Sequence, residues 1–269
     1  MSKKSPLGVF DSGIGGLTVA YAIKKVLPNE DIIYFGDTKH LPYGEKSSSA
    51  IIKFSRDIAN FLLEKKCKAI IIACNSASSI AYEEIKSISN KIPVFNVIDP
   101  VVKSIPIDDK KNIGVIGTKA TIESNVYYKK IKKVNSKQKV YSLATPLLAP
   151  MIEEGFINED ISKTIIRNYL RSSKLKNIEH LILACTHYPL IKCEINEFYN
   201  HRIKLIDSSH AVSLDVSNYL KKNNMLNEKE IPKYEFYVSN YTKSFEESAK
   251  FFFRRKIKLK EINLQSEFI

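Results

Sequence analysis

The sequence predicts an α/β protein made of two pseudo-symmetric α/β domains, whose mainly parallel sheets face a central cleft. Short apolar runs alternate with segments of helical periodicity along most of the chain, which is the pattern of parallel strands joined by helices. A Gly-Val strand motif and an Ala-Cys motif each occur twice, in the same order. This repetition indicates an internal duplication of one α/β unit.

The first half of the chain alternates regularly between expected strands and helices. The strands are expected at 7–10, 31–35, 70–72 and 93–97, and the helices at 17–26, 47–65 and 78–87. Within the segment 47–65, apolar residues recur at helical spacing, at Ile51, Phe54, Ile58, Phe61 and Leu62. The connections are short, which favours a parallel sheet with crossover helices.

The pattern begins again at Asp99-Pro100, where a helix is expected. The segment 112–121 resembles 8–13 in having Gly-Val, an apolar residue, a turn and then a helix. Further strands are expected at 140–143 and 181–184, and helices at 152–170 and 210–221. A tail follows with a strand at 234–238, a helix at 244–253 and an extended piece at 259–264.

These boundaries give an expected division into two domains. The first comprises 1–98 plus 208–269, with the tail returning to it, and carries Cys74. The second comprises 99–207 and carries Cys185. A two-fold arrangement of the units would bring their two sheet edges together around the cleft.

Composition limits the class of protein. The net charge is +13, yet 36 of the 42 basic residues are Lys rather than Arg, tryptophan is absent, and no surface interleaves Arg with aromatics. This argues against a nucleic-acid partner. No apolar run is long enough to cross a membrane, and no signal-peptide pattern precedes the first strand, so a cytoplasmic protein is expected. Four cysteines without a C-x-x-C pair predict free thiols rather than a disulfide framework.

The two Ala-Cys motifs are the main candidates for chemistry. Cys74 and Cys185 each follow a buried strand and precede small or polar residues. Two thiols at equivalent strand ends suggest one acid and one base on opposite faces of a carbon, which is what inversion of a stereocentre requires. Asp11, at the edge of the first unit, and His187 are candidate proton partners. The more ordinary alternative for either cysteine alone is a buried packing residue.

The Gly-rich turn that follows the first strand is the second candidate. It does not complete a G-x-G-x-x-G dinucleotide motif, because Thr18 stands where the last glycine would be. Its backbone N–H groups nevertheless suit a carboxylate. Side chains beside the turn and the thiols could hold an amino acid by its charged groups, namely Ser12, Asn75, Ser76 and Thr186. Taken one at a time, each of them is better explained by capping or turn formation.

The remaining cysteines and histidines give weaker evidence of function. Cys67 and Cys193 are expected to be packing residues in or beside helices. Cys185 and His187 lack the ligand spacing of a zinc site, so no metal is expected. No lysine motif for pyridoxal phosphate is recognisable, so no cofactor is expected.

Five motifs, in order along nearly the whole chain, resemble those of the aspartate/glutamate racemase superfamily, and of its glutamate racemases in particular. They are Gly8-Val9-Phe10-Asp11-Ser12-Gly13-Ile14-Gly15-Gly16-Leu17, Gly36-Asp37-Thr38 with Leu41-Pro42-Tyr43-Gly44, Ala73-Cys74-Asn75-Ser76-Ala77-Ser78, Gly117-Thr118-Lys119-Ala120-Thr121, and Ala184-Cys185-Thr186-His187-Tyr188-Pro189-Leu190. One departure is Ser76, where the family more usually has Thr; the hydroxyl is kept.

The resemblance implies a cofactor-independent enzyme that interconverts L- and D-glutamate and supplies D-glutamate for peptidoglycan synthesis. It also implies a homodimer. Cys74 and Cys185 would be the two bases, assisted by Asp11 and His187, with Glu153 near Cys185. The implied substrate contacts are Asp11, Ser12, Tyr43, Gly44, Asn75, Ser76, Thr118, Thr121, Thr186 and His187. The alternatives are an aspartate or other amino-acid racemase of the superfamily, or a basic protein that binds DNA or a topoisomerase.

Overall fold

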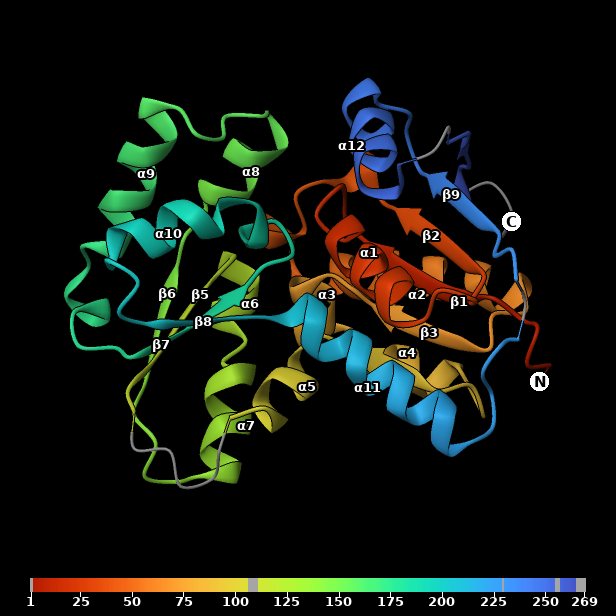
Figure 1. The fold of residues 1–269 in the computed structure, drawn as a ribbon, viewed down its shortest axis with the longest axis horizontal. Coiled ribbons are helices and arrows are strands. Elements are labelled where there is room, and N and C mark those ends of the chain that lie inside the picture. Colours follow the sequence, from red (N-terminus) through yellow and green to blue (C-terminus); the bar gives the residue numbers. More distant parts are fainter. Residues whose placement is uncertain (1, 106–110, 229, 255–256, 265–269) are drawn as a thin grey trace.

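The computed structural model describes residues 2–105, 111–228, 230–254 and 257–264. Two separate parallel sheets lie side by side, each flanked by helices (Figure 1). The α/β class and the parallel sheets predicted from the sequence are confirmed.

The first sheet has six strands in the order β10-β9-β2-β1-β3-β4, all parallel. Its strands are β1 (Leu7–Asp11), β2 (Ile32–Gly36), β3 (Ala69–Ile72), β4 (Val94–Asn96), β9 (Tyr234–Val238) and β10 (Leu259–Glu261). The helices of this part are α1 (Leu17–Val26), α2 (Ser48–Glu64), α3 (Asn75–Ile80), α4 (Tyr82–Ile88), α5 (Ile98–Lys103), α11 (Ser208–Lys222) and α12 (Lys243–Phe253).

The second sheet has four parallel strands in the order β6-β5-β7-β8. They are β5 (Ile113–Gly117), β6 (Val140–Ala144), β7 (His180–Ala184) and β8 (Lys204–Asp207). The accompanying helices are α6 (Lys119–Glu123), α7 (Val126–Val134), α8 (Leu148–Glu153), α9 (Asp160–Leu170) and α10 (Lys192–Phe198).

The duplication seen in the sequence is visible in the strand order. The four strands β2-β1-β3-β4 and the four strands β6-β5-β7-β8 have the same order and direction. The Gly-Val strands β1 and β5 therefore occupy equivalent places, and so do the strands β3 and β7 that precede the two thiols. Since all strands are parallel, the residues that follow β1, β3, β5 and β7 emerge at the carboxyl edges of the sheets.

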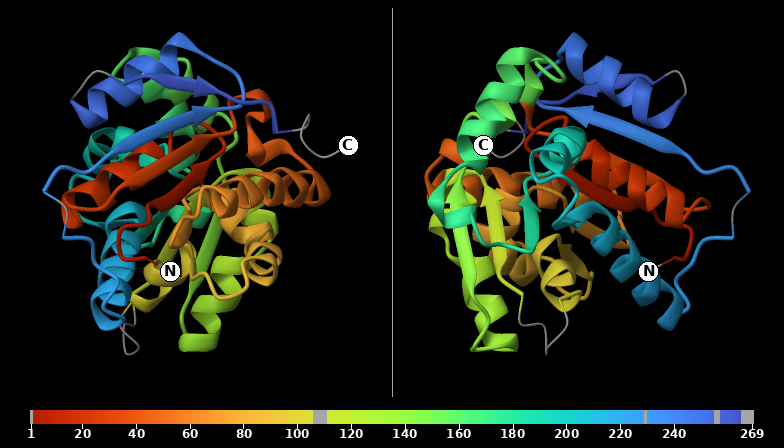
Figure 2. Two further views of the ribbon diagram at one scale, coloured as in Figure 1. Left: turned by 90° about the vertical axis from the view of Figure 1, so that its right-hand side faces the viewer. Right: turned by 60° about the vertical axis from the view of Figure 1, so that its left-hand side comes forward.

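The tail belongs to the first sheet. β9 pairs in parallel with β2, with Ile32 opposite Tyr234, and β10 adds to its outer edge. Figure 2 shows these blue C-terminal strands beside the red and orange N-terminal ones. The domain limits 98/99 and 207/208 themselves stay a prediction, and residues 265–269 lie outside the described part of the chain.

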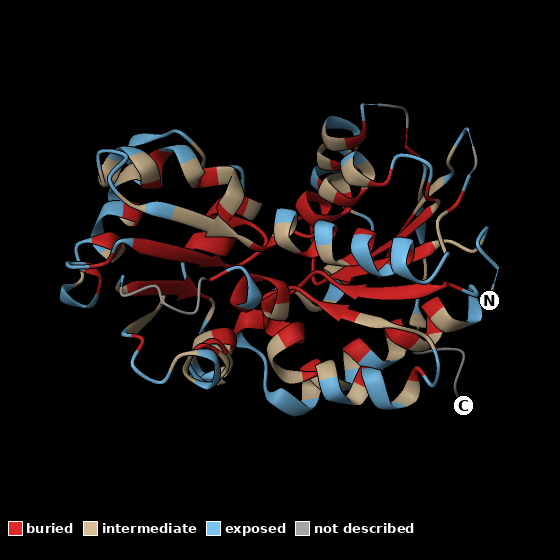
Figure 3. Cartoon of the chain, turned by 60° about the horizontal axis from the view of Figure 1, so that its bottom comes forward, coloured by how far each residue is buried: buried red, intermediate tan, exposed pale blue. Residues whose placement is uncertain are grey.

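The central strands of both sheets are buried on their two faces, which explains the continuous apolar runs in the sequence. The strands β6, β8 and β10 are partly exposed. On β1, Val9 packs into one hydrophobic cluster and Phe10 into another. The cluster that contains Val9 also contains Val115 and Ile182 of the second sheet, so the two halves share apolar packing. Figure 3 shows the buried strands (red) inside each half and exposed residues on the outer sides of the helices.

Two helix predictions were wrong in their extent. The segment 152–170, expected to be mainly helical, contains the last two residues of α8 and the whole of α9, because Gly155 has φ +83° and the helix α8 ends before it. The helix expected over 78–87 is divided at Ala81 into α3 and α4, and α3 begins directly after Cys74. The extended piece expected at 259–264 is a strand only to Glu261.

None of the helices in the described ranges combines the length and the apolar character needed to cross a bilayer.

Candidate active site

Cys74 and Cys185 line the same cavity. Cys74 stands between β3 and α3, and Cys185 directly follows β7. The cavity has a volume of about 180 Å³, below the range of about 300–1,000 Å³ that is usual for drug-sized ligands. Both cysteine side chains are almost completely buried. The site therefore suits one small molecule placed between two sulfur atoms.

Most of the residues predicted for the site line this cavity. They are Ser12, Tyr43, Gly44, Cys74, Asn75, Ser76, Thr118, Glu153, Cys185, Thr186 and His187. Asp11 and Thr121 lie behind the lining residues of the cavity. Asp11 is hydrogen-bonded to Ser12, and Thr121 is hydrogen-bonded to Thr118. The site prediction named only Glu153 from α8, and it missed the other lining residues of that segment, Ala149, Pro150 and Glu154, as well as Leu41 and Pro42.

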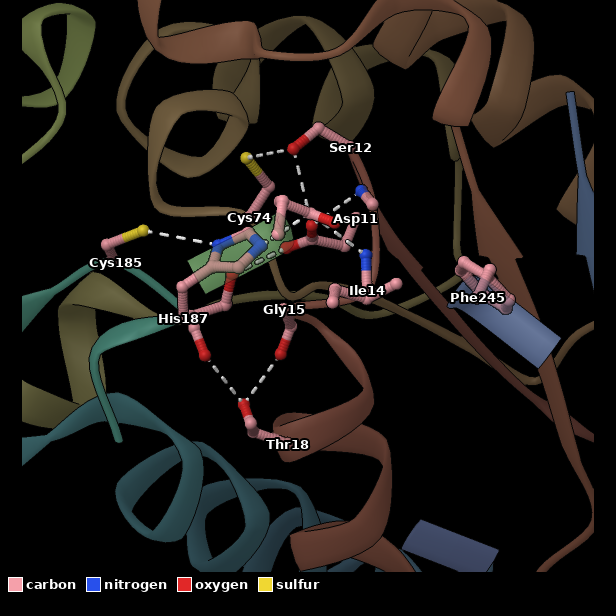
Figure 4. A network of polar contacts seen from close by, with 12 residues as sticks. Asp11, Ser12, Ile14, Gly15, Thr18, Cys74, Cys185, His187 and Phe245 are labelled. Carbon is pink, nitrogen blue, oxygen red and sulfur yellow. Dashed lines mark hydrogen bonds and ion pairs between the residues drawn. The ribbon is translucent and has the colours of Figure 1, made fainter. Parts of the chain in front are cut away.

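On one side of the cavity, a chain of hydrogen bonds leads from Cys74 to a buried carboxylate (Figure 4). The Cys74 thiol donates to Ser12 Oγ over 3.9 Å, and the Ser12 hydroxyl donates to Asp11 Oδ1 over 3.3 Å. The backbone N–H of Gly13 also donates to Asp11 Oδ1, at 2.9 Å. Asp11 thus reaches the Cys74 sulfur through Ser12.

On the other side, an imidazole connects Cys185 to a second carboxylate (Figure 4). His187 Nδ1 lies 3.5 Å from Cys185 Sγ, and His187 Nε2 lies 2.5 Å from Glu153 Oε1. The same Glu153 oxygen accepts the backbone N–H of Ile14 at 3.3 Å. Glu153, at the end of α8, thereby joins the second half of the chain to the Gly-rich turn of the first.

Further hydrogen bonds cross between the two thiol loops. The Thr186 hydroxyl donates to Asp11 Oδ2 at 3.0 Å. The Thr18 hydroxyl lies 2.8 Å from the Gly15 carbonyl and 3.1 Å from the Thr186 carbonyl, so it bridges the Gly-rich turn and the Cys185 loop. A Cβ at Gly15 would come within 2.5 Å of Thr186 Oγ1, which explains the glycine at this position. The turn therefore packs against the second thiol loop, rather than forming a dinucleotide site.

Burial and charge set the protonation of these groups. Burial and, as the second cause in size, the negative charge of Asp11 raise the pKa of the Cys74 thiol to about 12. Burial also raises the pKa of Asp11, although the charge of His187 opposes this. For His187, burial disfavours the charged form, but the hydrogen bonds with Cys185 and Glu153 outweigh it and raise the pKa well above its usual value. The two thiols thus have different electrostatic surroundings.

Three hydroxyl groups gather beside Asn75. Ser76 Oγ lies 2.8 Å from Thr118 Oγ1 and 3.5 Å from Thr121 Oγ1, and the Thr118 hydroxyl is 3.0 Å from that of Thr121. Thr118 also caps α6, since its Oγ1 accepts the N–H of Thr121. The serine at position 76 keeps the hydroxyl contact between the two halves.

A buried carboxylate fixes the loop that carries Tyr43 and Gly44. The Tyr43 hydroxyl donates to Asp37 Oδ2 at 2.6 Å, and the Ser239 hydroxyl donates to Asp37 Oδ1 at 2.6 Å. His40, for which the sequence suggested no role, lies 2.8 Å from Asp37 Oδ1 and stacks on Phe54. Asp37 therefore ties one wall of the cavity to the tail strand β9.

The other cysteines differ from each other. Cys67 is buried, as predicted, and burial raises its pKa to about 12. The prediction that Cys193 is a packing residue was wrong: α10 turns this side chain toward solvent. Within the described ranges, no group of three or more His, Cys, Asp or Glu side chains is arranged to hold a metal ion.

The chain is similar to known proteins over most of its length. The family model described as Asp/Glu/Hydantoin racemase matches residues 18–213. A protein of Caldanaerobacter subterraneus subsp. tengcongensis named glutamate racemase 3 is 40% identical over 254 residues, which are 94% of this chain and 92% of that protein. The glutamate racemase of Aquifex aeolicus is 44% identical over 216 residues, 80% of this chain and 83% of that protein.

A solved structure is similar over almost the entire chain. The glutamate racemase of Francisella tularensis subsp. tularensis, crystallised in complex with D-glutamate, superposes with a TM-score of 0.92. It is 42% identical in sequence, and the match covers 98% of this chain and 99% of that one.

Proposed function

Because this chain belongs to the Asp/Glu/hydantoin racemase family, we propose that it interconverts L- and D-glutamate by two-base proton transfer, without a cofactor. The names of its relatives and the D-glutamate bound to the Francisella protein support glutamate as the substrate. The observation that carries the mechanism is the pair of thiols, Cys74 and Cys185, that line one small cavity from equivalent strand ends.

In the proposed reaction, one sulfur removes the α-proton and the other returns a proton to the opposite face. With D-glutamate, the Cys74 thiolate takes the α-proton, and the Cys185 thiol protonates the resulting carbanion to give L-glutamate. With L-glutamate, the two cysteines exchange these tasks. Each turnover leaves one thiol protonated and the other ionised, in the reverse of the starting arrangement.

The main barrier to this reaction is the weak acidity of the α-proton. Its pKa is higher than that of a thiol by on the order of ten units, which corresponds to about 14 kcal/mol. A buried cavity with preorganised donors lowers this barrier, because charge that develops on the substrate carboxylate is met by fixed dipoles instead of mobile water. Asn75 and the hydroxyls of Ser76 and Thr118 are the candidate donors, and the hydroxyl of Thr121 supports that of Thr118 from behind.

The partners of each thiol would move protons in different ways. Ser12 would relay a proton between Cys74 and Asp11, since its hydroxyl contacts both. A protonated His187 would return a proton to the Cys185 sulfur, and Glu153 would stabilise the imidazolium. Because the pKa of Cys74 is about 12 in the free protein, we infer that the ammonium group of the substrate supplies positive charge that favours ionisation of this thiol.

The direct test is the loss of circular dichroism of L-glutamate with purified protein and no added cofactor. In deuterated water, incorporation of deuterium at the α-carbon should accompany racemisation. Cys74→Ser and Cys185→Ser should each lower the racemisation rate by about 10²–10⁴-fold, the usual contribution of a general base. Cys193→Ser, on the exposed face of α10, is the matched control and should keep full activity.

If either site variant racemised glutamate at the full rate, the two-base scheme would be wrong. The same assay with L-aspartate distinguishes the aspartate-racemase alternative, which predicts faster turnover of aspartate than of glutamate.

We further propose that the product D-glutamate is used for peptidoglycan synthesis in the cytoplasm and that the enzyme works as a homodimer. Depletion of the protein should then stop growth unless D-glutamate is supplied. Light scattering coupled to size-exclusion chromatography should give twice the chain mass of 30.7 kDa. A chain that remains a monomer at working concentration would contradict the second proposal.

A further inference from the structure

The geometry points to Tyr127 as a positioning residue that fixes the orientation of the Asn75 side-chain amide, so that its N–H donors meet a substrate carboxylate. This inference rests on the proposed function and assigns a role to a residue outside the motifs. Tyr127 belongs to α7 in the second half of the chain, whereas Asn75 opens α3 in the first half (Figure 1).

The contact between them is buried and well formed. The Tyr127 hydroxyl donates to Asn75 Oδ1 at 2.8 Å. Each of the two side chains is only 2% exposed, so water does not replace the bond easily. Burial and, to a smaller extent, the negative charges of Cys185 and Asp99 raise the pKa of the Tyr127 hydroxyl above its usual value. The hydroxyl therefore stays protonated and remains a donor.

A side-chain amide has a donor end and an acceptor end, and rotation by half a turn exchanges them. Within the described ranges, the Tyr127 hydroxyl has no other hydrogen-bond partner. If the amide rotated, the hydroxyl would accept from the amide nitrogen, and its own proton would lose its acceptor inside the protein. Tyr127 thus selects the rotamer in which the Asn75 oxygen faces away from the cavity.

The selected rotamer leaves the nitrogen of Asn75 available. Asn75 lines the cavity, and its Nδ2 atom is buried and has no hydrogen-bond partner among the described residues. An amide N–H recognises an anionic oxygen, and the hydroxyl groups of Ser76 and Thr118 lie next along this wall. This wall therefore presents donors, which suits a carboxylate and not an ammonium group.

Tyr127→Phe tests the inference, because the phenyl ring fills the same space without the hydroxyl. We expect the KM for both enantiomers of glutamate to rise about tenfold, because the carboxylate that Asn75 would bind is already charged in the bound substrate. The kcat should fall as well, because the charge on this carboxylate grows in the transition state. Tyr237→Phe is the matched control: its hydroxyl is also bonded inside the protein, to Glu235, but lies in β9 and outside the cavity lining. It should leave KM unchanged.

A double-mutant cycle separates positioning from a general structural role. If Tyr127 acts through Asn75, then Tyr127→Phe should have almost no further effect on KM once Asn75→Ala is present. Effects that simply add would overturn the inference, as would an unchanged KM in Tyr127→Phe alone.

Asn75→Asp tests the orientation without removing the tyrosine. One carboxylate oxygen would keep the bond from Tyr127, and the other would place negative charge where the amide nitrogen was. The KM for glutamate should then rise at least about a hundredfold, more than in Asn75→Ala, by repulsion between like charges. An Asn75→Asp protein that binds glutamate as well as the original would show the opposite orientation and overturn the inference. If the original protein itself did not racemise glutamate, the proposed function would fail, and this inference with it.

Discussion

At the scale of single residues, the two cysteines of the site have different surroundings. Cys74 is connected to a carboxylate through a hydroxyl, whereas Cys185 contacts an imidazole that is itself paired with Glu153. The Cys74 side has no cation of its own among the contacts of Ser12 and Asp11, apart from the more distant charge of His187. In the proposed reaction, the two sulfurs would therefore exchange protons with different partner groups.

The pH dependence of folding should report the state of His187. Its pKa is raised in the folded protein, so protonation stabilises the fold fully below the unfolded value near 6.5, and this contribution is lost as the pH rises through the folded value. Relative to His187→Gln, the original protein should be about 1.5–3 kcal/mol more stable at low pH, and less so as the pH rises. Denaturant unfolding at a series of pH values measures this difference.

His201→Gln is the control for that experiment, because His201 is exposed and lies outside the cavity lining. Its free energy of unfolding should follow that of the original protein at every pH. A His187→Gln difference that did not vary with pH would mean that His187 is not protonated in the folded state.

At the scale of the elements, the loops that follow β1 and β7 form a single unit. The Gly-rich turn holds Glu153 through the N–H of Ile14, and Thr18 and Asp11 hold the Cys185 loop. These loops are positioned by two different sheets, so their contacts also fix the distance between the two sheet edges. Small changes in the turn should therefore affect both stability and activity.

Thr18→Val should show this coupling. Valine has nearly the same shape, but it leaves the carbonyls of Gly15 and Thr186 without their hydroxyl donor. We expect a loss of about 1–3 kcal/mol in the free energy of unfolding, together with a lower kcat/KM. Thr18→Ser keeps the hydroxyl and should retain most of both. Urea unfolding and the racemisation assay test this, and equal behaviour of the two variants would rule out the bridge.

Most of the strands, and the positions of the two cysteines after buried strands, could be predicted from the sequence. The strand β8 was missed, because it has only two apolar residues and is partly exposed. Buried parallel strands are short apolar runs, and the Ala-Cys repeat marks the ends of β3 and β7. Helix limits were harder, because one glycine, Gly155, is compatible with a helical pattern but here adopts a left-handed conformation. The contacts made by Tyr127 and Thr18 join segments far apart in the chain, so no local pattern could reveal them.

At the scale of the whole molecule, a buried ion pair fastens the returning tail. Lys68 and Glu30 are 0% and 1% exposed, and Lys68 Nζ lies 2.6 Å from Glu30 Oε2. Lys68 also donates to the carbonyls of Lys3 and Met225, and Glu30 accepts the N–H of Asn227. The pair thereby joins the N-terminus, the first sheet and the segment between α11 and β9.

Lys68→Met should destabilise the protein by about 3–5 kcal/mol, because Glu30 would remain buried without its counter-charge. Adding Glu30→Leu should restore much of that loss. Lys243→Met removes an exposed pair with Glu247 and should change stability by less than about 1 kcal/mol. Thermal or denaturant unfolding compares the three. A Lys68→Met protein as stable as the original would show that the pair does not secure the tail.

The repeated strand order has a consequence for kinetics. The halves of the site are alike in topology and unlike in chemistry, while the two enantiomers of the substrate have equal free energies in water. The equilibrium constant of their interconversion is therefore unity, and the Haldane relation requires kcat/KM to be the same in both directions. The different surroundings of the two sulfurs can still make kcat and KM differ between the enantiomers. The enantiomer with the lower KM must then have a kcat that is lower by the same factor.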